Sequence, residues 1–118
     1  MASTVLIVDD HPSFRATARA LLEADGFDVV GEARDGREGV ELATRLHPDV
    51  VLLDVQLPDS TGFEVAAEIA SANGTEPSVV LVSSRDGSDY GEQISASGAR
   101  GFVAKGELSG AAIRSLLT

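Results

Sequence analysis

Residues 50–62 read VVLLDVQLPDSTG, a stretch that indicates both a type of fold and a position for chemistry. Its first four residues, Val50–Leu53, form an uninterrupted apolar run that is long enough for a strand and too short for a helix. A carboxylate, Asp54, ends the run, and the spacing of Pro58 and Gly62 predicts a tight loop into a following helix. Strands that are apolar on both faces are typical of parallel sheets covered by helices on each side.

The rest of the chain repeats this alternation of strand and helix. Further apolar runs of strand length are Thr4–Val8, Asp28–Ala33, Ser78–Val82 and Gly101–Ala104. Helical spacing of apolar residues is found in Pro12–Asp25, Gly36–Leu46, Gly62–Asn73, Ser88–Ser97 and Glu107–Leu117. Ser88–Ser97 is the weakest of these helices because it is polar and flanked by glycines. Five alternations predict an α/β fold: a doubly wound, five-stranded parallel (βα)5 sheet with helices on both faces.

Composition sets limits on the function. A length of 118 residues fits one domain, residues 1–118, and the absence of cysteine excludes disulfides and thiolate sites. A net charge of -10 argues against contact with nucleic acid by this segment, because phosphate binding depends on Lys and Arg. No apolar run reaches the ~18 residues that a membrane span needs. We therefore expect a cytoplasmic protein without membrane contact.

Polar residues that can do chemistry follow the predicted strands. Asp9 and Asp10 follow the first strand, Asp54 the third, Ser83 the fourth, and Lys105, the only lysine, the fifth. The carboxyl ends of parallel strands meet at one edge of the sheet, where α/β proteins bind their ligands. Carboxylates crowded at this edge repel one another, and a Mg²⁺ ion held by carboxylate oxygens would offset that repulsion. The pattern predicts a magnesium site.

This set of side chains also suits phosphoryl transfer. A carboxylate such as Asp54 can attack phosphorus and form an aspartyl phosphate, while a cation neutralises the phosphoryl oxygens. Lys105 would bring a compact positive charge to the phosphate, and Ser83 a hydroxyl group that can rotate to bond it.

Four segments carry a resemblance to a known family. Residues 5–12 (VLIVDDHP), 51–62 (VLLDVQLPDSTG), 80–84 (VLVSS) and 101–105 (GFVAK) resemble the receiver domain of bacterial two-component response regulators. The subgroup most similar to this chain has receivers that precede helix-turn-helix DNA-binding domains and act in transcription regulation. The resemblance implies a flavodoxin-like sheet with strand order 2-1-3-4-5.

The resemblance also implies the roles of individual residues. Asp54 would be the phosphoacceptor, and Mg²⁺ would be held by Asp10 and Asp54 directly, by Asp9 through water and by the Gln56 backbone carbonyl. The phosphate and switch residues would be Ser83, Ser84, Lys105 and Phe102, with Arg85 flanking the site. Apart from the resemblance, His11 could ligate the metal but is expected to be a surface residue beside the site. Tyr90 is expected to be a partly buried filler, although its place in the weakest helix would let it contribute to a partner surface.

Partners follow from the same resemblance. A sensor histidine kinase would supply the phosphoryl group to a chain that catalyses its own phosphorylation and dephosphorylation without being an enzyme on other substrates. The switch would act on an output domain or partner at the face formed by Ser88–Ser97, Gly101–Ala104 and Glu107–Leu117, with a homodimer as a further expectation.

Two other classes of function remain open from the sequence. A pseudo-receiver would keep the fold as an interaction module without the chemistry. A Mg²⁺-dependent aspartyl-phosphate phosphatase commonly has a second aspartate two residues after the nucleophile, where this chain has Gln56. Ser83 stands where threonine is frequent in receivers, and Gly106 where many have proline, which predicts looser coupling between the site and the rest of the domain.

Overall fold

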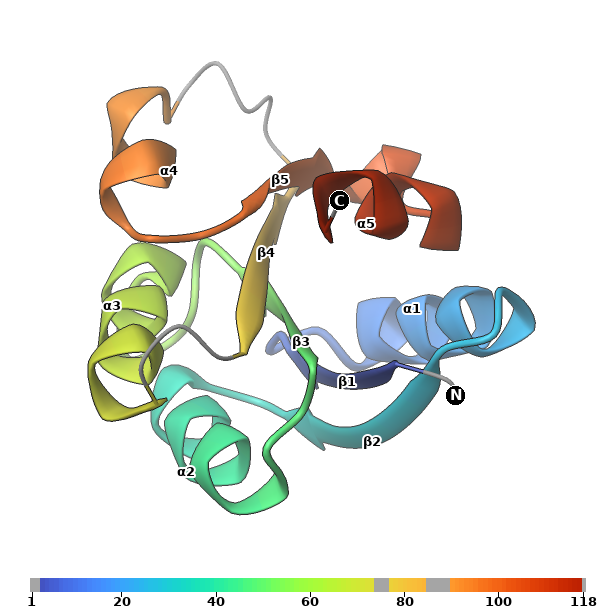
Figure 1. Cartoon of the computed structure of the whole chain (residues 1–118), viewed down its shortest axis with the longest axis horizontal. Coiled ribbons are helices and arrows are strands. Elements are labelled where there is room, and N and C mark those ends of the chain that lie inside the picture. Colours follow the sequence, from blue (N-terminus) through green and yellow to red (C-terminus); the bar gives the residue numbers. More distant parts are fainter. Residues whose placement is uncertain (1–2, 74–76, 85–89, 118) are drawn as a thin grey trace.

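The computed structural model describes residues 3–73, 77–84 and 90–117 and contains a five-stranded parallel sheet (Figure 1). The strands are β1 (Thr4–Val8), β2 (Asp28–Ala33), β3 (Val50–Asp54), β4 (Ser78–Ser83) and β5 (Gly101–Ala104), in the order β2-β1-β3-β4-β5. The helices are α1 (Pro12–Ala24), α2 (Gly36–Leu46), α3 (Gly62–Asn73), α4 (Glu92–Ala96) and α5 (Gly110–Leu117). The predicted flavodoxin-like fold and strand order are confirmed.

Helices cover both faces of the sheet. In Figure 1, α1 and α5 lie on one side of the strands, and α2, α3 and α4 on the other. Successive side chains of a strand point to opposite faces, so Val5 and Ile7 of β1 join one apolar cluster while Leu6 and Val8 join the other. All four of these side chains are at most 1% exposed. This two-sided burial explains why the strands are uninterrupted apolar runs in the sequence.

Most predicted boundaries agree with the structure, but the predicted start of the last helix is wrong. Helix α5 begins at Gly110 instead of Glu107, because Lys105–Glu107 forms a short 3-10 helix and Leu108 is extended. Ser109 then caps α5 by accepting a hydrogen bond from Ala112 N at 3.0 Å. The other differences are small. Strands β3 and β4 extend one residue further than predicted, and α1 ends one residue earlier.

The predicted weak helix Ser88–Ser97 is observed only as a short element. Helix α4 covers Glu92–Ala96, and its five residues make no more than about one and a half turns. Residues 88 and 89 lie outside the described residues. None of the residues of α4 is buried, so little apolar packing holds this helix in place.

The loop between β3 and α3 is tight because Gly62 lies against the end of β3. Gly62 N donates a hydrogen bond to Val55 O at 2.7 Å, and a Cβ at residue 62 would collide with the backbone oxygen of Asp54. Thr61 and Glu64 form a capping box at the start of α3, with each side chain accepting from the other's backbone N–H at 3.2 Å. These contacts fix the backbone on which Asp54 sits.

Gly62→Ala should destabilise the protein, because the obstructing atom is backbone and cannot rotate away. We expect a loss of about 2 kcal/mol in the free energy of unfolding, measured by urea denaturation. Gly106→Ala is the matched control, since a Cβ there would meet nothing within 4 Å. Equal stability of the two variants would contradict this description of the loop.

Candidate phosphoryl-acceptor and metal site

Sheet register brings the predicted site residues to one edge. Val8 of β1 pairs with Leu53 of β3, so Asp9 and Asp54 occupy neighbouring positions at the carboxyl ends of these strands. On the other side, Ser83 of β4 pairs with Ala104 of β5, which places Lys105 immediately beyond the same edge. The strand order of the sheet reverses at β1: its neighbour on one side is β2, and its neighbour on the other side is β3.

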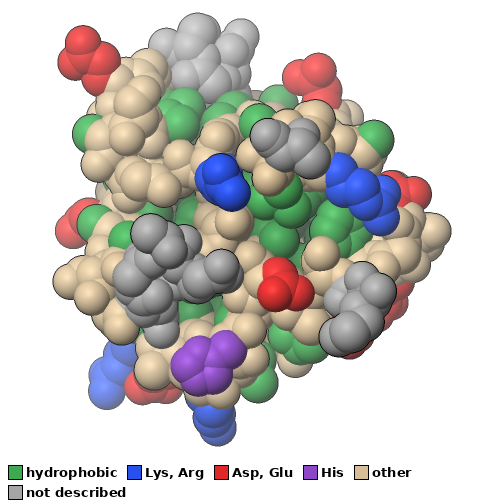
Figure 2. All heavy atoms as spheres, in the orientation of Figure 1, with side chains coloured by type: hydrophobic (Ala, Val, Ile, Leu, Met, Phe, Trp, Pro, Cys, Tyr) green, Lys and Arg blue, Asp and Glu red, His purple; other side chains and the backbone are tan. Residues whose placement is uncertain are grey.

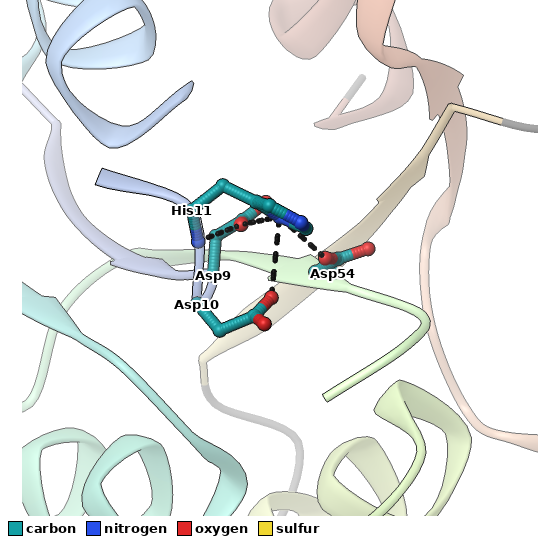
Figure 3. Close-up of side chains that lie close together, drawn as sticks. All are labelled: Asp9, Asp10, His11 and Asp54. Atoms are coloured by element: carbon teal, nitrogen blue, oxygen red, sulfur yellow. Dashed lines mark hydrogen bonds and ion pairs between the residues drawn. The ribbon is translucent and has the colours of Figure 1, made fainter. Parts of the chain in front are cut away.

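Three carboxylates and one imidazole converge at this edge (Figure 3). One ligand atom each from Asp9, Asp10, His11 and Asp54 lies within 4.8 Å of all the others. Asp9 is fully buried and Asp54 is 3% exposed. The structure therefore brings together the three acids that the sequence placed in one site.

His11 contributes more to this cluster than expected. Its side chain is 60% exposed, yet Nδ1 lies 2.8 Å from Asp9 Oδ1, 3.2 Å from Asp10 Oδ1 and 3.9 Å from Asp54 Oδ2. Figure 3 shows the ring edge directed at the carboxylates. The backbone N–H of His11 also donates to Asp9 Oδ1 at 2.8 Å. His11 is at the surface, as predicted, and its Nδ1 is also part of the cluster.

Lys105 faces the two buried carboxylates. Its Nζ lies 2.7 Å from Asp9 Oδ2 and 3.4 Å from Asp54 Oδ2, and the side chain is 16% exposed. The ammonium group also lies 4.4 Å from the centre of the Phe14 ring, which gives it a favourable cation–π contact. The only lysine of the chain is thus held between the acids and an aromatic face.

Burial raises the pKa of the Asp54 carboxyl from 3.8 to about 6, and the negative charge of Asp9 adds to the rise. Lys105 opposes this shift, as does the hydrogen bond that Gln56 N donates to Asp54 Oδ1 at 3.4 Å. Lysine therefore offsets only part of the cost of holding this carboxylate in its charged form. A further positive charge at the site would therefore favour the charged form of Asp54.

The donor set fits a hard divalent cation. Among the residues that the structure describes, only two buried side-chain oxygens lack a hydrogen bond of good geometry, Asp9 Oδ2 and Asp10 Oδ1. Both have a nitrogen nearby, Lys105 Nζ at 2.7 Å and His11 Nδ1 at 3.2 Å respectively. Oxygen atoms with spare lone pairs beside further carboxylates are what Mg²⁺ or Ca²⁺ ligation requires.

The other predicted site residues differ in how deeply they are buried. Ser83 is 3% exposed at the end of β4, whereas the neighbouring Ser84 is exposed. Phe102 of β5 is half-buried against the apolar cluster on the α3 side of the sheet. Gln56 has an exposed side chain and forms an isolated bridge with Thr61, and the role of its carbonyl remains a prediction. Arg85 lies outside the described residues.

Two residues near the site, Arg15 and the half-buried Tyr90, make contacts that the sequence did not predict. Arg15 Nη1 donates to the backbone oxygen of Asp9 at 2.6 Å while its Nε bonds Glu32 at 3.1 Å, which anchors the end of β1 to α1 and β2. The hydroxyl of Tyr90 lies 3.2 Å from Ser83 Oγ. Arg15 could have been found from its position one turn after His11, but no spacing in the sequence indicates the Tyr90 contact.

Two further observations concern the surface of the molecule. On the face shown in Figure 2, Lys and Arg side chains do not gather into one basic patch. Within residues 3–73, 77–84 and 90–117, no helix has both the length and the apolar character needed to span a membrane.

Asp54→Asn should stabilise the protein increasingly as pH rises, when metal is removed with EDTA. An unfolded Asp ionises near pH 3.9, and folded Asp54 near 6, so wild type loses stability as pH rises through this window and the Asn variant does not. Between pH 4.5 and 7.5, the variant should gain about 2 kcal/mol relative to wild type in urea denaturation. Asp28→Asn, at the exposed start of β2, controls for the loss of one charge. A stability difference that is constant with pH would contradict the raised pKa.

Comparison with known proteins gives the family. Residues 5–116 match the response regulator receiver domain family. The transcription regulator BvgA of Bordetella pertussis is 38% identical over 107 residues, which cover 91% of this chain and 51% of BvgA. A transcriptional regulator of Pseudomonas aeruginosa is 39% identical over 105 residues, which cover 89% of this chain and 50% of that protein. This chain thus spans about half the length of the curated relatives it matches.

Solved structures agree with this result. A two-component response regulator of the LuxR family from Aurantimonas superposes with a TM-score of 0.88 at 30% identity, over 99% of this chain and 86% of the other. The receiver domain of the response regulator NarL from Mycobacterium tuberculosis gives a TM-score of 0.84 at 36% identity, over 98% and 97% of the two chains. From the match over residues 5–116, the fold and the strand-end cluster of acids and lysine, we conclude that the chain belongs to the response regulator receiver domain family of two-component systems.

Proposed function

We propose that this receiver accepts a phosphoryl group on Asp54 from a sensor histidine kinase and changes conformation in response. The observation that carries the proposal is the position of Asp54, buried at the strand edge with Asp9, Asp10 and Lys105 around it. A carboxylate held in this way can act as a nucleophile. Its phosphorylation would change the net charge among the residues around it.

The chemical step needs no general base. Ionised Asp54 has no proton to lose, so one of its oxygens can form a bond to phosphorus as the bond from phosphorus to the donor's nitrogen or oxygen breaks. With a pKa of about 6, the carboxyl is mostly ionised at pH 7. Lys105 Nζ, which lies 3.4 Å from Asp54 Oδ2, would pair with an oxygen of the transferred group.

The acidic cluster would hold the cation that this transfer requires. Asp10 and Asp54 would be direct ligands of Mg²⁺, with Asp9 acting through water and Gln56 through its backbone carbonyl. When bound, Mg²⁺ would neutralise charge on the phosphoryl oxygens. The two oxygens without a hydrogen bond of good geometry, Asp9 Oδ2 and Asp10 Oδ1, support this assignment.

Phosphorylation would then shift the balance between two conformations. The aspartyl phosphate would carry up to about two negative charges where the carboxylate carries one, which gives Lys105 a further partner besides Asp9 and gives Ser83 Oγ a strong acceptor. Phe102 would follow Ser83 and alter the face made by α4, β5 and α5.

We propose that this face contacts an output domain, a partner protein or a second copy of the chain. The output is the control of transcription, in keeping with relatives such as BvgA that are transcription regulators of about twice this length.

Phosphorylation should depend on Asp54. Incubation with radiolabelled acetyl phosphate and Mg²⁺ should label the wild type, and the label should be lost by at least tenfold in Asp54→Asn. Asp28→Asn removes the same charge from the opposite end of the sheet and should label as the wild type does. Full labelling of Asp54→Asn would show that the acceptor lies elsewhere.

Asp10→Ala should weaken Mg²⁺ binding, because it removes an oxygen ligand at the centre of the cluster. Isothermal titration should show a dissociation constant at least tenfold higher than in wild type. Asp28→Ala serves as the control for net charge. An unchanged titration curve for Asp10→Ala would remove this residue from the ligand set.

A further inference from the structure

A hydrogen bond connects the end of β4 to a group of aromatic rings. Ser83 Oγ lies 3.2 Å from the hydroxyl oxygen of Tyr90. The Tyr90 ring packs edge-on against Phe63 of α3, with centroids 5.5 Å apart and planes at 62°, and tilted against Phe102 of β5 at 5.9 Å and 48°. We call Phe63, Tyr90 and Phe102 the aromatic cluster. It reaches Ser83 through a hydroxyl that only Tyr90 can supply, because the other two members are phenylalanines.

The aromatic cluster fixes the position of the Tyr90 hydroxyl. The ring is half-buried and has an aromatic neighbour on two different elements, α3 and β5. Edge-to-face and tilted ring pairs are each worth about 0.5–1.5 kcal/mol beyond the burial of apolar area. The Tyr90 hydroxyl is therefore tied to the packing of two elements, whereas a serine hydroxyl moves by a single rotation about χ1.

The hydroxyl of Ser83 has one proton to donate. An oxygen of a phosphoryl group on Asp54 can only accept a hydrogen bond, so Ser83 must turn its O–H toward that oxygen to bind it. Either hydroxyl can be the donor of the Ser83–Tyr90 bond, and we assign the donor role to Ser83. With its one proton directed at Tyr90, Ser83 cannot also donate to a phosphoryl oxygen, so we assign this contact to the unphosphorylated state.

We infer that Tyr90 is a positioning residue that holds the Ser83 hydroxyl in the unphosphorylated state and releases it on phosphorylation. The inference rests on the proposed phosphorylation of Asp54 and adds to it a residue that opposes the switch. An interaction present in only one of two states shifts the equilibrium toward that state. Loss of the Tyr90 hydroxyl should therefore make the phosphorylated arrangement easier to reach.

The same contact carries the change to a surface. When Ser83 leaves Tyr90, the tyrosine hydroxyl loses a partner at the point where its ring touches Phe102 of β5. Ile94 of α4 and Ala99, just before β5, are partly buried against the same apolar cluster as Phe102 and Tyr90. Repacking of Tyr90 would thus be transmitted to the neighbouring surface of α4 and β5.

Tyr90→Phe tests the inference because it removes one oxygen atom and keeps the ring. With Mg²⁺ at saturation, the protein is titrated with beryllofluoride, a mimic of the phosphoryl group, and the bound form is followed by ¹⁹F NMR. We expect Tyr90→Phe to lower the beryllofluoride midpoint by about twofold to tenfold, the range that one hydrogen bond represents. An unchanged or higher midpoint would overturn the inference.

A double-mutant cycle isolates the two hydroxyl groups from other effects. Ser83→Ala removes both the donor to the phosphoryl mimic and the bond to Tyr90, so its midpoint serves as the reference for the second half of the cycle. In the Ser83→Ala background, Tyr90→Phe should have no further effect, since the bond is already absent. A persistent effect of Tyr90→Phe in that background would show that Tyr90 acts by another route and would overturn the inference.

Tyrosine fluorescence gives an independent measurement, because Tyr90 is the only tyrosine and the chain has no tryptophan. Beryllofluoride with Mg²⁺ should change the emission of the wild type, and the change should be smaller in Ser83→Ala. Identical emission in the free and bound wild type would overturn the inference. Absence of any bound ¹⁹F signal in the wild type, or a signal that survives in Asp54→Asn, would overturn the proposed function together with the inference, so the two failures can be told apart.

Discussion

The central constraint on the structure is the burial of two negative carboxylates, Asp9 and Asp54, beside a single ammonium group. Lys105 Nζ lies within 3.4 Å of both, yet the pKa of Asp54 is still raised to about 6 by burial and by the charge of Asp9. One lysine cannot neutralise two buried acids. A site with excess negative charge of this kind favours a divalent cation, and it is sensitive to any group that later adds charge to Asp54.

The rest of the fold holds this unfavourable arrangement in place. Strands β1 and β3 are buried on both faces, so their ends cannot move apart without exposing apolar side chains. Arg15 fixes the backbone of Asp9 from α1, and Gly62 lets the loop after β3 pack against the backbone of Asp54. In contrast, the short helix α4 has no buried residue. The molecule thus combines a rigid acidic edge with a weakly packed element on the side where Ser83 and Tyr90 meet.

Much of the fold could be predicted from the sequence, because it depends on local patterns. Apolar runs gave β1, β2 and β5 with their observed bounds, and the rule for parallel strands placed Asp9, Asp54 and Lys105 together. The start of α5 could not be predicted in this way. Leu108 fits the helical spacing but packs from an extended backbone, and Asp25, 85 residues away, accepts a hydrogen bond from Gly110 N at 2.7 Å. Contacts of single rotamers, such as those of His11 and Tyr90, depend on neighbours that spacing does not reveal.

The fact that the chain has a single lysine, and that it lies in the site, has a chemical consequence. Apart from the amino terminus, the ε-amine of Lys105 is the sole primary amine of the protein, and its side chain is only 16% exposed between Asp9, Asp54 and the ring of Phe14. Reagents that acylate amines therefore have one side-chain target. Their rate of reaction would report how far that amine is shielded, without interference from lysines elsewhere on the surface.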